Sequence, residues 1–209
     1  MYHSRALILK KEEWGEADWR VSALTADFGK IRLLAQGVRK HGAKLQGHLE
    51  AGAISEISFV IGRNGYRLTT ARLAAFPLGS RGSPLKLSLL AGMLGTIDAN
   101  LLEERDRARE LFGTAETALA VLEAADDDAT LRRLAVWFQV RFLSFLGVFP
   151  SPRSPEARSV PRLLELQYHP PAALSGEGFD PAELEREFAW LAQRLGRAFS
   201  PVGFVPAVR

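Results

Sequence analysis

The sequence predicts an α+β protein in which a small five-stranded barrel precedes a helical domain. Short segments of alternating apolar and polar residues, separated by turns that contain glycine, fill residues 4–73, and such segments are typical of strands. From residue 85 the apolar residues instead recur every three or four positions, which is the spacing of helices with one buried face. The change falls at the stretch PLGSRGSP, so we expect one domain at residues 1–80 and another at 81–209.

The strands of the first domain are predicted from alternation and from their turns. In the second expected strand, Trp19, Val21 and Ala23 lie on one face and Arg20 and Ser22 on the other. In the third, Ile31, Leu33 and Ala35 lie on one face, and the other carries Lys30, Arg32, Leu34 and Gln36. Gly29 suits the bulged turn that follows, because glycine adopts positive φ without strain, and Asn64-Gly65 is a strong hairpin signal. Five short strands in about 75 residues suit a closed or nearly closed barrel. They are expected at residues 6–11, 19–25, 30–36, 54–61 and from 66 onward.

Helices fill the second domain. Ser83 suits the N-cap of the first helix and Pro84 its first turn, while Asp128 is expected to cap the third. That third helix is apolar on almost every side, as is typical at the centre of a bundle. Asp180 is expected to cap the last helix, which Pro181 opens. The helices are expected at residues 85–101, 103–122, 131–146 and 181–195. A proline-rich loop is expected at 150–178, with one short helix near 161–167 in it.

The charge of the chain is unevenly distributed. Its formal net charge is +3. Residues 1–82 hold 13 Lys and Arg against 7 Asp and Glu, whereas residues 83–209 hold 14 against 17. A basic first part indicates that a polyanionic partner binds the predicted barrel, although small β domains are also found to be basic without such a partner.

No catalytic or metal-binding pattern is recognisable. The chain has no cysteine, which excludes disulfides, thiolate zinc sites and cysteine nucleophiles. Motifs of phosphate-binding loops, dinucleotide folds, serine hydrolases and zinc proteases are absent, and the four histidines are scattered. We therefore expect a protein that is not an enzyme and holds no cofactor or metal. No apolar run reaches the roughly 18 residues of a membrane span, and no signal peptide is apparent, so a cytoplasmic protein without a membrane partner is expected.

A binding surface remains as the expected function. A five-stranded barrel of the OB-fold type with a basic face commonly holds nucleic acid, with cations along the backbone and aromatic side chains under the bases. Trp14 and Tyr66 are the candidate stacking residues. The alternative interpretations are that these aromatics belong to the core and that the cations are merely solvated. The candidate DNA-binding cations are Lys10, Lys11, Arg20, Lys30, Arg32, Arg39, Lys40, Lys44, Arg63 and Arg67.

Two stretches resemble RecO recombination mediator proteins. One is GEADWRVSALTADFGKIRLLAQGVRK at residues 15–40, and the other is FLSFLGVFP at residues 142–150. The first resembles that family's pattern of GE-x-D, a strand ending in Thr, a loop ending in Gly, and A-x-G-x-R. The matching residues are Gly15, Glu16, Asp18, Thr25, Gly29, Ala35, Gly37 and Arg39. Many family members carry a four-cysteine zinc module after the second stretch, whereas this chain has no cysteine. Either the module is present without its metal or it has shrunk to a loop, and the sequence favours the loop.

The resemblance implies a function in DNA repair. RecO proteins bind single- and double-stranded DNA, anneal complementary strands and help to load recombinase onto DNA coated by single-strand-binding protein. The implied protein partners are RecR and the C-terminal tail of single-strand-binding protein, and the implied location is cytoplasmic, with the nucleoid. Arg132, Arg133 and Arg141 on the third helix are candidate cations for that acidic tail. The competing hypothesis is a protein–protein adaptor whose barrel does not bind DNA.

Overall fold

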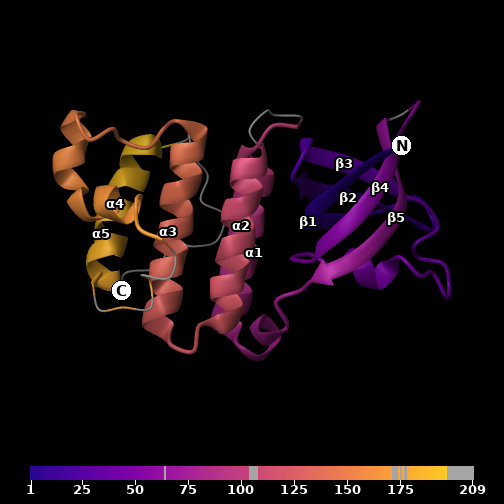
Figure 1. The fold of residues 1–209 in the computed structure, drawn as a ribbon, viewed down its shortest axis with the longest axis horizontal. Coiled ribbons are helices and arrows are strands. Elements are labelled where there is room, and N and C mark those ends of the chain that lie inside the picture. Colours follow the sequence, from indigo (N-terminus) through magenta and orange to yellow (C-terminus); the bar gives the residue numbers. More distant parts are fainter. Residues whose placement is uncertain (64, 104–107, 171–173, 175, 177, 197–209) are drawn as a thin grey trace. The chain divides into compact units, whose positions relative to one another are not determined.

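A computed structural model of the chain describes residues 1–63, 65–103, 108–170, 174, 176 and 178–196. A closed five-stranded barrel is followed along the chain by helices (Figure 1), which confirms the predicted fold class. The chain divides into two compact units. The first contains residues 1–77 and 97–116, and the second contains residues 78–96 and 117–209. Independent folding of residues 1–80 stays a prediction.

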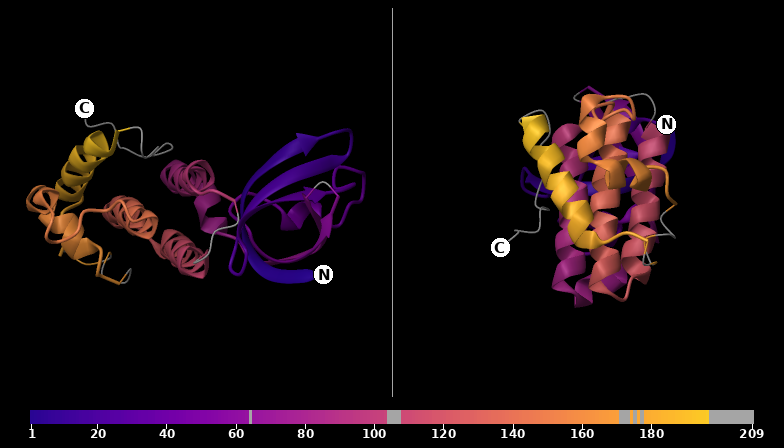
Figure 2. Two further views of the ribbon diagram at one scale, coloured as in Figure 1. Left: turned by 90° about the horizontal axis from the view of Figure 1, so that it is seen from above. Right: turned by 90° about the vertical axis from the view of Figure 1, so that its left-hand side faces the viewer.

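The five strands close into a barrel (Figure 2, left). Their order around it is β1-β2-β3-β5-β4. Neighbouring strands are antiparallel except for β3 and β5, which are parallel and pair only at Leu33–Tyr66 and Leu34–Arg67. Beyond this short pairing, Lys30 in β3 forms an isolated parallel bridge with Glu103. The strands are β1 (Tyr2–Trp14), β2 (Asp18–Thr25), β3 (Gly29–Ala35), β4 (Ile54–Gly62) and β5 (Gly65–Ala75).

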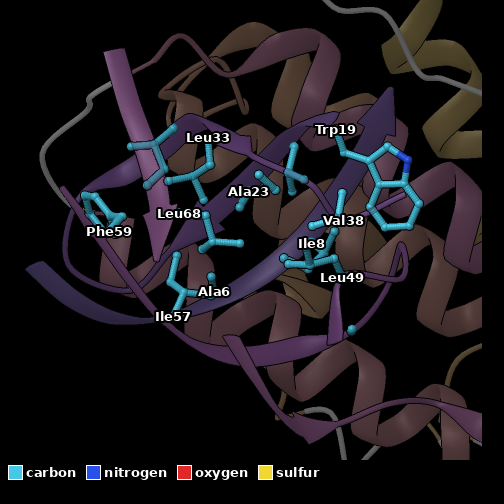
Figure 3. Packing of buried hydrophobic residues seen from close by; sticks show 14 residues of the cluster. Ala6, Ile8, Trp19, Ala23, Leu33, Val38, Leu49, Ile57, Phe59 and Leu68 are labelled. Carbon is cyan, nitrogen blue, oxygen red and sulfur yellow. The ribbon is translucent and has the colours of Figure 1, made fainter. Parts of the chain in front are cut away.

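The barrel interior is filled by the apolar residues that the alternation assigned to the inner face. Trp19, Val21 and Ala23 of β2 are buried together with Ile31 and Leu33 of β3, and Figure 3 shows such side chains from several strands meeting inside the barrel. Because side chains alternate between the two faces of a strand, the residues between them point outward. This places the basic residues of β2 and β3 on the outer surface.

The helices follow the sequence pattern, with two corrections. Glu103, predicted to start the second helix, instead forms a β-bridge with Lys30, and that helix is described from Ala108. The other correction concerns a cap. Ser83 Oγ accepts a hydrogen bond from the backbone N–H of Lys86, and Asp180 Oδ1 accepts one from Ala182, as expected for N-caps. The third helix is capped by Asp127 rather than Asp128, because Asp127 has the extended backbone and accepts from Thr130 N–H. The α-helices are α1 (Pro84–Asn100), α2 (Ala108–Ala124), α3 (Asp128–Leu146), α4 (Pro161–Leu166) and α5 (Pro181–Leu195). Short 3-10 helices lie at Gln46–His48, Leu78–Gly82 and Pro155–Ser159.

In the second unit, α3 packs against both α4 and α5 and buries most of its residues. The proline-rich stretch after it contains the short helix α4, near the predicted residues 161–167.

None of the helices in the described residues is both long and apolar enough to cross a lipid bilayer.

Candidate nucleic-acid interface

A hollow of about 450 Å³ lies on the outer surface of the barrel. It is built from the end of β1, from β2 and β3, from the start of β5, and from Glu103 after α1. A smaller hollow of about 110 Å³ lies beside it, since both are lined by Arg20 and Arg32. We call the two together the barrel groove. Its lining residues are Lys10, Glu12, Trp14, Arg20, Ser22, Arg32, Leu33, Leu34, Gly65, Tyr66, Asp98 and Glu103.

The position of the groove matches the surface that OB-folds use for ligands. In such barrels the face of strands 2 and 3, with the loops joining strands 1 to 2 and 4 to 5, binds oligonucleotides and oligosaccharides. Trp14 ends β1 just before the first of these loops, and Gly65 begins β5 just after the second. The groove therefore has a candidate stacking residue near each loop.

The two candidate stacking residues differ in how much of their rings is accessible. Trp14 is 47% exposed, and the guanidinium carbon of Arg20 lies 3.5 Å from its ring centroid. Tyr66 is only partly exposed, because its ring packs edge-to-face on the buried Phe59 at 5.3 Å between centroids. Arg20 lies over one face of the indole, so Trp14 and Arg20 form a cation–π pair. Tyr66 belongs partly to the core.

Most of the groove's cations already face a carboxylate. Lys10 Nζ is 2.5 Å from Glu12 Oε1, and Arg32 Nε is 2.9 Å from Glu103 Oε1. The hydrogen bond with Glu12 raises the pKa of Lys10 above its ordinary value, and the same bond lowers the pKa of Glu12. The charge on the surface of the groove is therefore largely balanced.

Lys30 is a correction to the predicted set of DNA-contacting cations. Its side chain is 5% exposed, with Nζ 2.9 Å from Asp98 Oδ1. Nζ also donates to the backbone carbonyls of Asp98 and Leu101, at the end of α1. These acceptors explain why a lysine is buried on the outer face of β3, since cations stabilise the carbonyl end of a helix. Lys30 therefore anchors the end of α1 and offers no free ammonium to a phosphate.

Asp98 is the acidic centre of this anchor. Besides Lys30, its carboxylate accepts a hydrogen bond from Ser22 Oγ at 2.7 Å. Burial by itself would raise the pKa of Asp98, but the hydrogen bonds from Lys30 and Ser22 hold it below its ordinary value. The alternation placed Ser22 on the outer face, and it is buried there by this contact.

Residues 37–47 form a loop after β3 that carries Arg39, Lys40 and Lys44. We call it the basic loop, and its base is held against the β1–β2 turn. Asp18 Oδ1 accepts a hydrogen bond from Gly37 N–H at 2.7 Å, and Arg39 pairs with Glu13 at 3.0 Å. The backbone N–H of Arg39 also donates to the carbonyl of Ala17. Arg39 thus has a structural role besides any contact with DNA. Lys11 is likewise engaged, by Glu50 at 2.6 Å and by the ring of Trp19.

Four of the predicted cations are both exposed and outside the ion pairs described above. Lys40 and Lys44 lie on the basic loop, Arg63 lies in the β4–β5 turn, and Arg67 lies in β5 beside Leu34 of the groove. Within the described part of the chain, none of the four has a carboxylate within ion-pair distance. With Arg20, these are the predicted cations best placed to meet phosphates.

The three predicted partner-binding arginines of α3 are used inside the second unit. Arg132 makes a bidentate ion pair with Glu185 of α5. Arg133 donates to the carbonyls of Phe179 and Leu174, and Arg141 donates to that of Gln167. They fasten α3 to the chain that follows α4 and to α5.

The sequence interpretation missed the three groove carboxylates, Glu12, Asp98 and Glu103. The ion pair of Glu12 with Lys10 could have been predicted, since Glu12 lies two residues after Lys10 on the same face of β1. The ion pairs of Asp98 and Glu103 could not be predicted, because their partners are about 70 residues away in the sequence and only the fold brings them together. Among the described residues, no three His, Asp or Glu side chains gather as ligands of a metal ion would.

Comparison with known proteins agrees with the architecture. Residues 1–76 match the family described as Recombination protein O N terminal. A curated DNA repair protein RecO from Dehalococcoides mccartyi is 31% identical over 152 residues, which cover 73% of this chain and 58% of that relative. One from Heliobacterium modesticaldum is 27% identical over 150 residues, or 72% of this chain and 53% of the relative.

These alignments are about twice as long as the barrel, so the similarity continues into the helices. The chain spans a little over half the length of these relatives. A barrel that matches the family's N-terminal domain, followed by helices within the aligned length, assigns this chain to the RecO family.

Proposed function

We propose that this chain is a recombination mediator in DNA repair that binds DNA through the barrel groove and the basic loop at residues 37–47. The exposed Trp14 beside Arg20 carries the proposal, because an accessible ring with an adjacent guanidinium suits an unpaired base and its phosphate. The RecO names of the relatives support a repair function. Binding rather than catalysis is the expected activity.

Phosphate contacts should supply most of the affinity. Arg20, Lys40 and Lys44, with Arg63 and Arg67, are the proposed contacts, and we leave Lys30 out because it is buried. Each phosphate neutralised on a single strand contributes about −0.7 to the slope of log K against log salt. Four to five contacts therefore predict a slope of about −3 to −3.5.

A salt titration tests the proposal. Fluorescence anisotropy of a labelled oligothymidylate would be measured at several salt concentrations for the parent chain and for Lys40→Ala/Lys44→Ala. The double variant should flatten the slope by about 1.4, with little dependence on base sequence. Arg153→Ala/Arg158→Ala is the matched control, because it removes two exposed cations of the second unit and should leave the slope unchanged.

The competing function is a protein–protein adaptor whose barrel does not bind DNA. The balanced charges of the groove favour this alternative more than the sequence did. Absence of binding to oligothymidylate at low salt would support the adaptor and refute the DNA-binding proposal. Annealing is a further proposal, and a quenching assay with two complementary labelled strands measures it directly.

The acidic, apolar tail of single-strand-binding protein is a proposed partner of the second unit. RecR is a further proposed partner of the chain. Arg132, Arg133 and Arg141 are engaged internally. A hollow of about 570 Å³ is lined by Val148, Pro150, Ser154, Glu156, Leu191, Arg194 and Leu195, and it offers apolar walls and one arginine. We place the proposed tail site there. Arg194→Ala should weaken binding of a tail peptide, whereas Arg141→Ala should affect stability first.

A further inference from the structure

The barrel groove contains carboxylates at the places where a nucleic-acid backbone would bind. Glu103 lines the larger hollow together with Trp14 and Tyr66, and its carboxylate oxygen lies 2.9 Å from Nε of Arg32. Both side chains are about half exposed, at 57% for Arg32 and 47% for Glu103. The ion pair is therefore open to solvent, and an incoming anion can reach it.

The fold holds Glu103 at this position. Its backbone bridges to Lys30 in β3, on the part of that strand beyond the pairing with β5. Lys30 in turn binds Asp98 and the carbonyl of Leu101, so the chain from Asp98 to Glu103 is fastened along β3. On such a fixed backbone, the pairing of Glu103 with Arg32 has to order only the two side chains.

A carboxylate and a phosphate make the same kind of charge-assisted contact with a guanidinium. We propose that Glu103 competes with the DNA backbone for Arg32 and thereby sets the affinity of the groove for single strands. A phosphate at Arg32 has to displace Glu103, and the displaced carboxylate then repels the strand. Arg32 consequently adds little to the net release of counterions, although it lies in the centre of the groove. This inference rests on the proposed DNA-binding function.

Glu103→Gln tests the competition, because glutamine keeps the size of the side chain and the backbone bridge but removes the charge. Glu103→Gln removes the competitor for Arg32 and also a negative charge close to the phosphates. It should therefore raise affinity for an oligothymidylate about 3- to 10-fold at low salt. The salt slope should steepen by about 0.7, since Arg32 becomes free to neutralise one phosphate. Glu103→Asp, which keeps the charge, should stay near the parent.

Glu56→Gln is the matched control. Glu56 also pairs with an exposed arginine of the barrel, Arg72 at 3.0 Å, and lies outside the groove. Glu56→Gln changes the net charge of the chain by the same amount as Glu103→Gln. Any gain in DNA affinity that it gives therefore measures the general effect of removing one negative charge. A gain of equal size in Glu103→Gln and Glu56→Gln would overturn the proposal.

An Arg32→Gln background completes the experiment. In that background Glu103→Gln should no longer steepen the salt slope, because competition requires Arg32, and it should raise affinity only by the effect of removing one negative charge near the strand. A slope that still steepens by about 0.7 would refute the proposed mechanism. Thermal unfolding of each variant separates loss of folding from loss of binding. If the parent and Glu103→Gln both fail to bind DNA at low salt, the proposed function itself fails. If the parent binds and Glu103→Gln binds equally well, only this inference fails.

Discussion

Replacement of Lys30 by methionine should destabilise the first unit strongly without changing the salt dependence of DNA binding. The substitution keeps the length and apolar stem of the side chain but removes the ammonium. It leaves the partly buried carboxylate of Asp98, 27% exposed, with only the Ser22 hydrogen bond, and it removes the donor of two carbonyls at the end of α1. Removing one partner of a buried ion pair costs about 3–5 kcal/mol. Because Asp98 keeps some solvent, we expect about 3 kcal/mol.

Hydrogen exchange of the β2 and β3 amides measures this effect on the unit that contains the pair, since exchange reports the free energy of opening locally. Asp98→Asn should cost less, about 2 kcal/mol, because the asparagine keeps a polar group near Ser22 and Lys30 keeps its carbonyl acceptors. The double variant Lys30→Met/Asp98→Asn should cost less than the sum of the two single changes by about 1–3 kcal/mol. Arg72→Met should change the free energy little, since its ion pair is exposed.

Two results would refute this account of Lys30. A change in opening free energy as small as that of Arg72→Met would mean that the buried ion pair contributes nothing. A folded Lys30→Met protein whose salt slope is flatter by about 0.7 would mean that Lys30 neutralises a phosphate after all.

Three further predictions concern acid, a helix cap and metal content. Hydrogen bonds from Ser4 and Arg109 lower the pKa of Asp27 below its ordinary value of 3.8. The stability that Asp27 contributes is therefore present above pH 3.8 and is lost as the pH falls below it. Asp27→Asn should make the free energy of unfolding depend less on pH in this acid range. Asp180→Ala should cost the second unit about 1 kcal/mol in urea unfolding, whereas Asp180→Asn should be nearly neutral because asparagine also caps. Metal analysis of untagged protein should find no stoichiometric zinc, and one tightly bound zinc per chain would contradict this.

The inner surface of the barrel was predictable because it depends only on alternation along each strand. Trp19, Val21 and Ala23 are buried as expected, and so are Ile31 and Leu33. Their burial needs no knowledge of which strands are neighbours, because any closed barrel covers one face of every strand. The fold class followed from the same local signals.

The outer surface was less predictable, because its burial depends on contacts made far along the sequence. Lys30 and Ser22 follow the same alternation as Arg20 and Arg32, yet Lys30 and Ser22 are buried by the end of α1. The partner of Lys30 is 68 residues away. No local pattern distinguishes an outward lysine that meets solvent from one that meets a helix end.

The residues that suggested the RecO family make structural contacts in this fold. Gly15 and Gly37 have positive φ, of 60° and 68°, where other residues are strained. Asp18 accepts the hydrogen bond of Gly37, while Arg39 pairs with Glu13. The pattern thus joins the β1–β2 turn to the base of the basic loop. These contacts fix the base of the basic loop against the β1–β2 turn. Lys40 and Lys44 lie beyond that base and are exposed, so they are available for the phosphate contacts proposed above.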